Sequence, residues 1–164
     1  MSPDTAYDLF IAAPMSALSG EAYAAGRGDI VRIMERLSAV HDFGPIYFAG
    51  AAISGPEAFS GEAAALRRDL EALRRSRMFV LVYPSKTVTS ALVEVGYAMA
   101  LRLPCLLLVN AREDLPYLLK QAESGLASDI LPPLRIAELR DADRAAGEIA
   151  AFRDETMREQ GRLG

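Results

Sequence analysis

Residues 78–110 read MFVLVYPSKTVTSALVEVGYAMALRLPCLLLVN, and this stretch decides the fold. It begins with an apolar run, residues 78–83, and ends with another, residues 105–110, both rich in β-branched, leucine or aromatic side chains. Short apolar runs without alternation are typical of strands that are buried on both faces. A hydroxyl-rich loop and an apolar helical stretch, residues 90–101, separate them. The segment therefore predicts a strand, a helix and a second strand parallel to the first.

The same order of strand and helix extends toward both ends of the chain. A third apolar run lies at residues 9–13, a weaker one at residues 46–49, and a fifth strand is expected around residues 134–137. Between these runs, and after the last of them, apolar residues recur at helical spacing. The helices are expected around residues 30–40, 66–73, 90–101 and 142–158, and the third, apolar nearly all round, is expected to be buried. We therefore predict a single α/β domain over residues 1–164: a flavodoxin-like, Rossmann-like parallel sheet of about five strands with helices on both faces.

Composition excludes several classes of function. The 18 Lys and Arg against 22 Asp and Glu give a net charge of −4, which disfavours nucleic acid and anionic lipid as partners. One Cys and one His cannot form a disulfide or an ordinary zinc site, so we expect no metal and no cofactor. No apolar run reaches the roughly 18 residues of a membrane span, and we expect a cytoplasmic protein.

Glu94 is the one acid in residues 87–101, and no Lys or Arg lies three or four positions from it on the expected helix. Burying an unpaired carboxylate is unfavourable by several kcal/mol unless its pKa rises or a partner comes from elsewhere. The structural alternative is a carboxylate at the helix edge that reaches water. Asp69 is the second candidate, because it is expected on the apolar side of its helix; the alternative for Asp69 is an ion pair with a neighbouring arginine.

Two loops offer seats for an anion. The loop before Glu94 carries Ser85, Lys86, Thr87, Thr89 and Ser90 at the expected start of a helix, where backbone amides and hydroxyls favour an anion, although a simple N-cap explains it equally. After the first strand, Arg27 lies between two glycines and could bind a phosphate, although a solvated turn is the commoner meaning of this pattern.

Three motifs, in this order, resemble the nucleoside 2-deoxyribosyltransferase superfamily, which includes nucleoside monophosphate N-glycosidases. They are the strand and loop LFIAAPM at residues 9–15, the acid of DLEAL at residues 69–73, and EVGYA at residues 94–98 followed by LPCLLL. The resemblance implies that Glu94 is the nucleophile at the anomeric carbon and that Asp69 holds or protonates the substrate. Tyr97 would hydrogen-bond the Glu94 carboxylate.

The same resemblance implies the substrate-binding side. Ala13, Pro14 and Met15 would line the base, and the hydroxyl loop would face the sugar or its 5′-phosphate. The transferases carry a further acid shortly before the Glu, and this chain has none there, which favours hydrolysis over base exchange. Related proteins are commonly dimers, so the resemblance also implies a homodimer or higher homo-oligomer.

Two other functions remain open. The Toll/interleukin-receptor-like domains, which cleave the nicotinamide glycosidic bond of NAD, are similar in their first strand and in a Glu on a helix after a Ser-containing loop. A module that senses nucleotides or assembles without turnover would keep the pocket and lose the reaction. Products released from a substrate panel would separate these possibilities.

Overall fold

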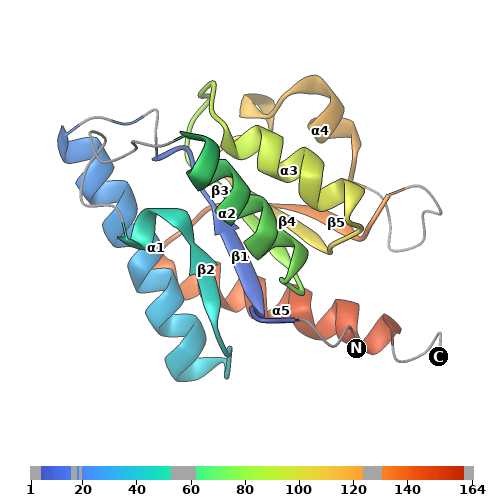
Figure 1. The fold of residues 1–164 in the computed structure, drawn as a ribbon. Helices are drawn as coiled ribbons and strands as arrows, with labels where there is room; N and C mark the ends of the chain where they lie inside the picture. Colours follow the sequence, from blue (N-terminus) through green and yellow to red (C-terminus); the bar gives the residue numbers. More distant parts are fainter. Residues whose placement is uncertain (1–4, 16–17, 19, 53–61, 124–130, 161–164) are drawn as a thin grey trace.

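The computed structural model describes residues 5–15, 18, 20–52, 62–123 and 131–160. Its centre is a five-stranded parallel sheet with the strand order β2-β1-β3-β4-β5 (Figure 1). The strands are β1 (Leu9–Ala12), β2 (Ile46–Phe48), β3 (Phe79–Tyr83), β4 (Cys105–Val109) and β5 (Leu134–Glu138). This is the predicted flavodoxin-like sheet, and all five expected strands are present.

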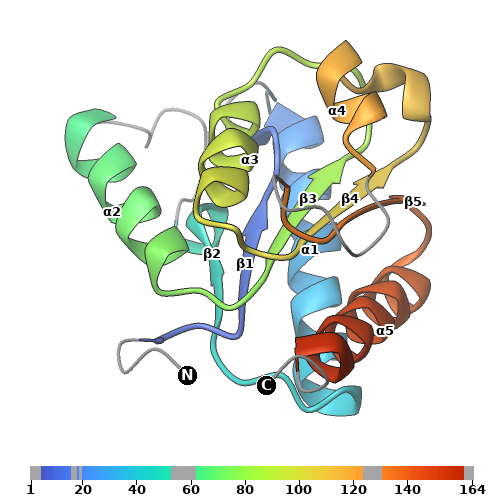
Figure 2. The same cartoon turned by 90° about the vertical axis from the view of Figure 1, so that its right-hand side faces the viewer.

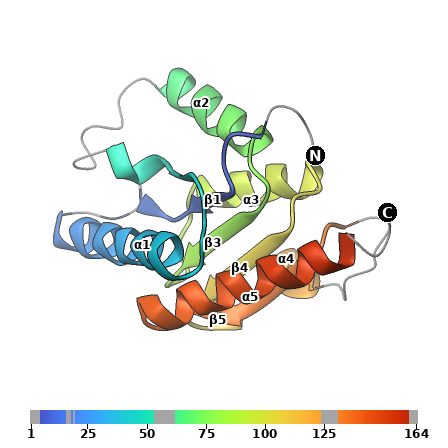
Figure 3. The ribbon, with the colours of Figure 1, turned by 90° about the horizontal axis from the view of Figure 1, so that it is seen from below.

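Helices cover both faces of the sheet. They are α1 (Gly20–Val40), α2 (Glu62–Arg74), α3 (Ala91–Ala100), α4 (Tyr117–Gln121) and α5 (Ala142–Gln160), with short 3-10 helices η2 (Ala49–Ala52) and η4 (Arg112–Asp114). Seen from below, α1 and α5 run along one side of the sheet and α2 lies on the other (Figure 3). The view of Figure 2 shows the strands ending at a common edge, as a parallel sheet requires.

Alternate side chains of the strands belong to two separate cores. Leu9, Ile11 and Val80 face α1 and α5. Phe10 and Leu81 face α2 and α3. β3 and β4 are buried along their whole length, which explains why their sequences are continuously apolar.

The chain leaves β1 toward one face and β3 toward the other. α1 packs with α5, whereas α2 packs with α3. In open α/β sheets, this reversal between neighbouring strands creates a crevice beyond their carboxyl ends where ligands bind. The fold thus directs attention to the edge formed by the ends of β1 and β3.

One expectation about packing was wrong. We expected the apolar helix at residues 90–101 to be buried, but the Val93 side chain of α3 is 63% exposed and Gly96 and Ala100 also face outward. A helix that covers a sheet buries only the face that contacts it, here Ala91, Val95 and Ala98, whatever its other residues are.

Candidate functional site

Glu94 and Asp69 line one cavity of about 360 Å³, which we name the carboxylate cavity. Its walls come from the carboxyl end of β1, from Phe48 and the following turn, from α2 and from the beginning of α3. It brings together five of the residues predicted from the sequence: Ala13, Met15, Asp69, Ser90 and Glu94. Two acids from separate helices therefore meet at the edge of the sheet where this fold binds ligands.

The Glu94 side chain is partly buried, and burial raises its pKa to about 8. The negative charge of Asp69 contributes to the same increase. Among the described residues, the Glu94 carboxylate has no ion-pair partner and accepts no hydrogen bond. Glu94 is therefore neither paired on the outer surface nor sealed away from a cavity, the two arrangements that would exclude a chemical role.

Asp69 is held by a group that the sequence analysis missed. The Tyr47 hydroxyl donates a hydrogen bond to Asp69 Oδ1 over 2.6 Å, and Arg68 Nε lies 3.9 Å from the same oxygen. The Asp69 side chain is 15% exposed. Of its two partners, Tyr47 is the closer and is partly buried, whereas the Arg68 side chain is 59% exposed. Burial, together with the nearby Asp69 carboxylate, raises the pKa of the Tyr47 hydroxyl, which stays a donor at neutral pH.

Aromatic packing fixes the Tyr47 ring. It stacks on Phe10 with ring centres 5.0 Å apart and meets Tyr7 edge to face at 5.3 Å. These contacts orient a ring that has few rotatable bonds. Tyr47 is thus a rigid support that sets where the Asp69 carboxylate lies. In the sequence, the only signal for it is a hydroxyl within the weak apolar run at residues 46–49.

The hydroxyl loop before α3 is organised mainly by its own contacts. Thr87 N donates to the Tyr83 hydroxyl over 2.8 Å, and that hydroxyl donates to Thr87 O over 2.5 Å. Thr89 Oγ1 accepts a hydrogen bond from Ala91 N, so it serves as a cap at the beginning of the helix. Of the five predicted loop residues, Ser90 alone is among the residues that line the carboxylate cavity. Ser85, Lys86 and Ser90 itself are exposed.

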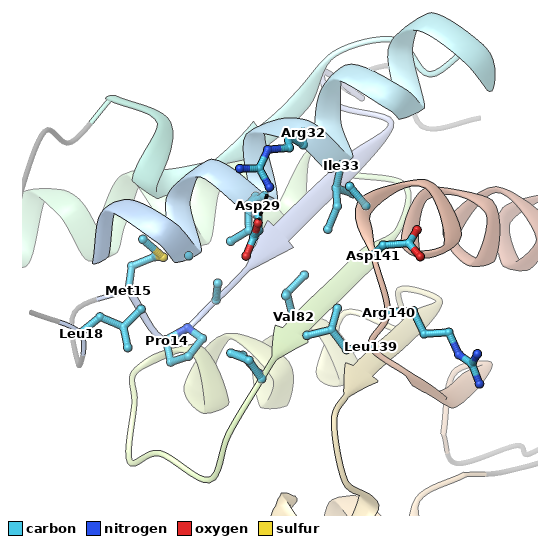
Figure 4. A pocket seen from close by; sticks show the side chains of 15 residues that line it. Pro14, Met15, Leu18, Asp29, Arg32, Ile33, Val82, Leu139, Arg140 and Asp141 are labelled. Atoms are coloured by element: carbon cyan, nitrogen blue, oxygen red, sulfur yellow. Dashed lines mark hydrogen bonds and ion pairs between the residues drawn. The ribbon is translucent and has the colours of Figure 1, made fainter. Parts of the chain in front are cut away.

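The loop after β1 lies between two cavities. Ala13 and Met15 line the carboxylate cavity and also a second cavity, which Pro14 borders as well (Figure 4). Met15 is only 4% exposed, so its side chain forms a wall and not a surface. The predicted base-binding loop is therefore in a position to contact a ligand in the carboxylate cavity.

Two further predicted residues, Arg27 and Tyr97, are not among the residues that line the carboxylate cavity. Arg27 Nε donates to Gly50 O over 3.0 Å and its Nη2 donates to Ala51 O over 2.7 Å, so its guanidinium holds the turn after β2. Tyr97 is partly buried against the core that faces α2 and α3, and it is not one of the residues that line the carboxylate cavity. No hydrogen bond joins Tyr97 to Glu94 in the described part of the chain.

Two comparisons with known proteins were negative. The sequence matches no protein-family model, and a search of curated proteins returns no significant match. Within the described ranges, no three or more metal-binding side chains cluster, and no helix has the length and apolar character needed to cross a membrane. The site must therefore be interpreted from its own chemistry.

Proposed function

We propose that this chain hydrolyses the N-glycosidic bond of a nucleoside or a nucleoside monophosphate, with Glu94 as the nucleophile. The observation that carries the proposal is the carboxylate cavity itself: two acids from different helices face one hollow, and the pKa of Glu94 is raised to about 8 by burial and by Asp69. Pairs of acids that differ in environment are typical of glycosidases. The cavity volume of about 360 Å³ falls in the range of small-ligand sites.

The proposed reaction has two steps. First, an oxygen of the ionised Glu94 carboxylate forms a bond to the anomeric carbon as the bond from this carbon to the base nitrogen breaks. The bonding electrons leave with the base, which takes up a proton from solvent. Water then attacks the anomeric carbon of the glycosyl ester and gives up a proton to solvent, which releases the sugar and restores the carboxylate. A poorly solvated carboxylate is a reactive nucleophile, and the cationic character of the sugar in the transition state favours its ionised form.

Asp69 has a supporting role in this proposal. Its carboxylate is held by the Tyr47 hydroxyl at one oxygen, which leaves the other oxygen available to a sugar hydroxyl or to the departing base. Hydrogen bonds to the sugar that strengthen as the bond breaks lower the barrier further. Ser90 is the hydroxyl of the preceding loop that lines the same cavity. If the substrate is a nucleotide, Ser90 would be the nearest of the predicted loop side chains to its sugar or phosphate.

The test is release of free base. The purified chain is incubated separately with ribonucleosides, deoxyribonucleosides, their 5′-monophosphates and NAD, and the products are separated by chromatography. The proposal expects a free base from at least one nucleoside or monophosphate, and Glu94→Gln should abolish its release. Cleavage of NAD alone would favour the Toll/interleukin-receptor-like reaction. Thermal stabilisation by nucleotides without any product would favour a binding module.

A further inference from the structure

A second cavity of about 310 Å³ lies on the other side of the loop that follows β1, and we name it the switch-point cavity. It is bordered by the carboxyl ends of β1 and β3, by α1, and by the segment that leads into α5 (Figure 4). The chain turns to opposite faces of the sheet after β1 and β3, so this cavity occupies the position where open α/β sheets bind ligands. The proposed reaction makes no use of it.

The walls of the switch-point cavity are apolar. They include Leu18, Ile30, Ile33, Val82 and Leu139, which come from four different parts of the chain. Gly26 also borders it, and a side chain at this position would approach Leu18 Cδ1 to 3.2 Å. A cavity with such walls favours a ligand with apolar faces, and its volume, at the low end for ligand sites, limits the ligand to one or two rings.

Charged groups at the mouth are already neutralised. Asp29 Oδ1 and Arg32 Nη1 lie 2.7 Å apart on α1, as Figure 4 shows. Arg140 pairs with Glu138 over 2.5 Å. Asp141 Oδ2 lies 3.7 Å from Arg144 Nε, and its Oδ1 accepts a hydrogen bond from Arg144 N over 3.0 Å. An ionic ligand would add net charge to a mouth whose charged side chains are already paired, whereas a neutral ligand would not.

The Asp29–Arg32 pair offers an acceptor beside a donor. Both side chains are about two-thirds exposed, at 65% and 66%, and an ion pair so exposed contributes little to stability, so its groups can turn to a ligand. A ring with an N–H next to an unprotonated ring nitrogen matches this arrangement, because it donates to a carboxylate and accepts from a guanidinium.

We propose that the switch-point cavity binds a neutral heteroaromatic molecule of one or two rings, with its faces against the apolar walls and its hydrogen-bonding edge against Asp29 and Arg32. This site is separate from the carboxylate cavity, although Ala13 and Met15 line both. Binding there requires no turnover, so the proposal can be tested whether or not the chain is a glycosidase.

The probe is 7-azaindole, which has the required donor beside an acceptor and is fluorescent, while the protein contains no Trp to interfere. Two variants fill one cavity each: Ala142→Phe the switch-point cavity and Ala65→Phe the carboxylate cavity. We expect saturable binding to the wild type and to Ala65→Phe, and at least tenfold weaker binding to Ala142→Phe. Binding that survives Ala142→Phe, or the absence of saturable binding to the wild type, would overturn the proposal.

Matched ligands test the proposed hydrogen bonds to Asp29 and Arg32. Indole lacks the acceptor nitrogen and benzoate carries a charge, so both should bind several-fold more weakly than 7-azaindole. Arg32→Gln should weaken 7-azaindole binding and leave indole binding unchanged. Equal binding of benzoate and 7-azaindole would contradict the assignment of a neutral ligand.

A chemical measurement covers the case in which Ala142→Phe does not fold. Ala142→Cys places a thiol on the cavity wall, and 7-azaindole should slow its alkylation by iodoacetamide at least threefold. The native thiol, Cys105, is fully buried, and burial raises its pKa to about 12, so it does not compete. An alkylation rate that 7-azaindole leaves unchanged would reject the site.

Discussion

Asp8 at the amino end of the sheet and Glu94 at its carboxyl end have different surroundings. At the amino end, Asp8 Oδ2 accepts a hydrogen bond from Gly44 N over 2.7 Å, and its Oδ1 lies 3.4 Å from Arg77. At the carboxyl end, Glu94 faces a cavity, and burial raises its pKa to about 8. The Asp8 carboxylate is thus occupied by contacts within the fold, whereas burial without a cationic partner disfavours the charged form of Glu94. The comparison separates an acid used to build the fold from one available for chemistry.

Replacing Glu94 and Asp8 by their amides tests the difference between the two acids most directly. Glu94→Gln should lower kcat/KM for base release by roughly 10³-fold or more, because an amide oxygen cannot form the glycosyl ester. Asp8→Asn is the matched control at the other end of the sheet, and its kcat/KM should stay within about twofold of the wild type. Steady-state kinetics measures both. Turnover retained in Glu94→Gln would remove Glu94 from the proposed reaction.

The pH profile sharpens the role of Glu94. A nucleophile must be ionised, so kcat/KM should rise with pH and level off near pH 8, where the Glu94 carboxyl of the unliganded enzyme loses its proton. Below that value the increase should be about tenfold per pH unit. A fall in kcat/KM above pH 8 would instead make Glu94 the acid that protonates the departing base.

Stability should depend on pH in a way that Glu94 determines. The unfolded carboxyl loses its proton near 4.5 and the folded one near 8, so the folded state binds more protons in this interval. The Glu94 contribution to the free energy of unfolding therefore falls by about 1.4 kcal/mol per pH unit from pH 4.5 to 8 and is constant above pH 8. Glu94→Gln should remove this slope in urea titrations and be the more stable protein at pH 9. An unchanged slope would show that Glu94 is well solvated.

Tyr47→Phe gives the smallest effect. It removes the hydroxyl that holds Asp69 and keeps the ring that stacks on Phe10. We expect a loss of about 1 kcal/mol in the free energy of unfolding and roughly a tenfold decrease in kcat. Tyr7→Phe retains its edge contact with Tyr47 and serves as the control. Equal kcat values for Tyr47→Phe and the wild type would limit Tyr47 to a packing role.

Sequence alone predicted the sheet and singled out the two acids as candidates, because both inferences depend on local patterns. Continuous apolar runs mark buried strands, and a lone Glu in an apolar helix is visible without coordinates. The helical stripe of α2 also placed Asp69 toward the interior, where its side chain is 15% exposed. These inferences require only spacing along one element.

Contacts between distant elements could not be predicted in this way. Tyr47 reaches Asp69 because β2 lies beside β1 and α2 packs above them, an arrangement set by strand order and not by the sequence around Tyr47. Arg27 resembled a phosphate ligand because its glycine neighbours are local, whereas its carbonyl partners lie 23 and 24 residues away. Single-sequence periodicity carries no information on such pairs.

The attachment of Arg27 to the turn after β2 links the two cavities at the carboxyl edge of the sheet. Its neighbour Gly26 borders the switch-point cavity, while Gly50, whose carbonyl it grips, borders the carboxylate cavity. One guanidinium therefore joins the helix that walls the first cavity to the rim of the second, so the two hollows share a structural support.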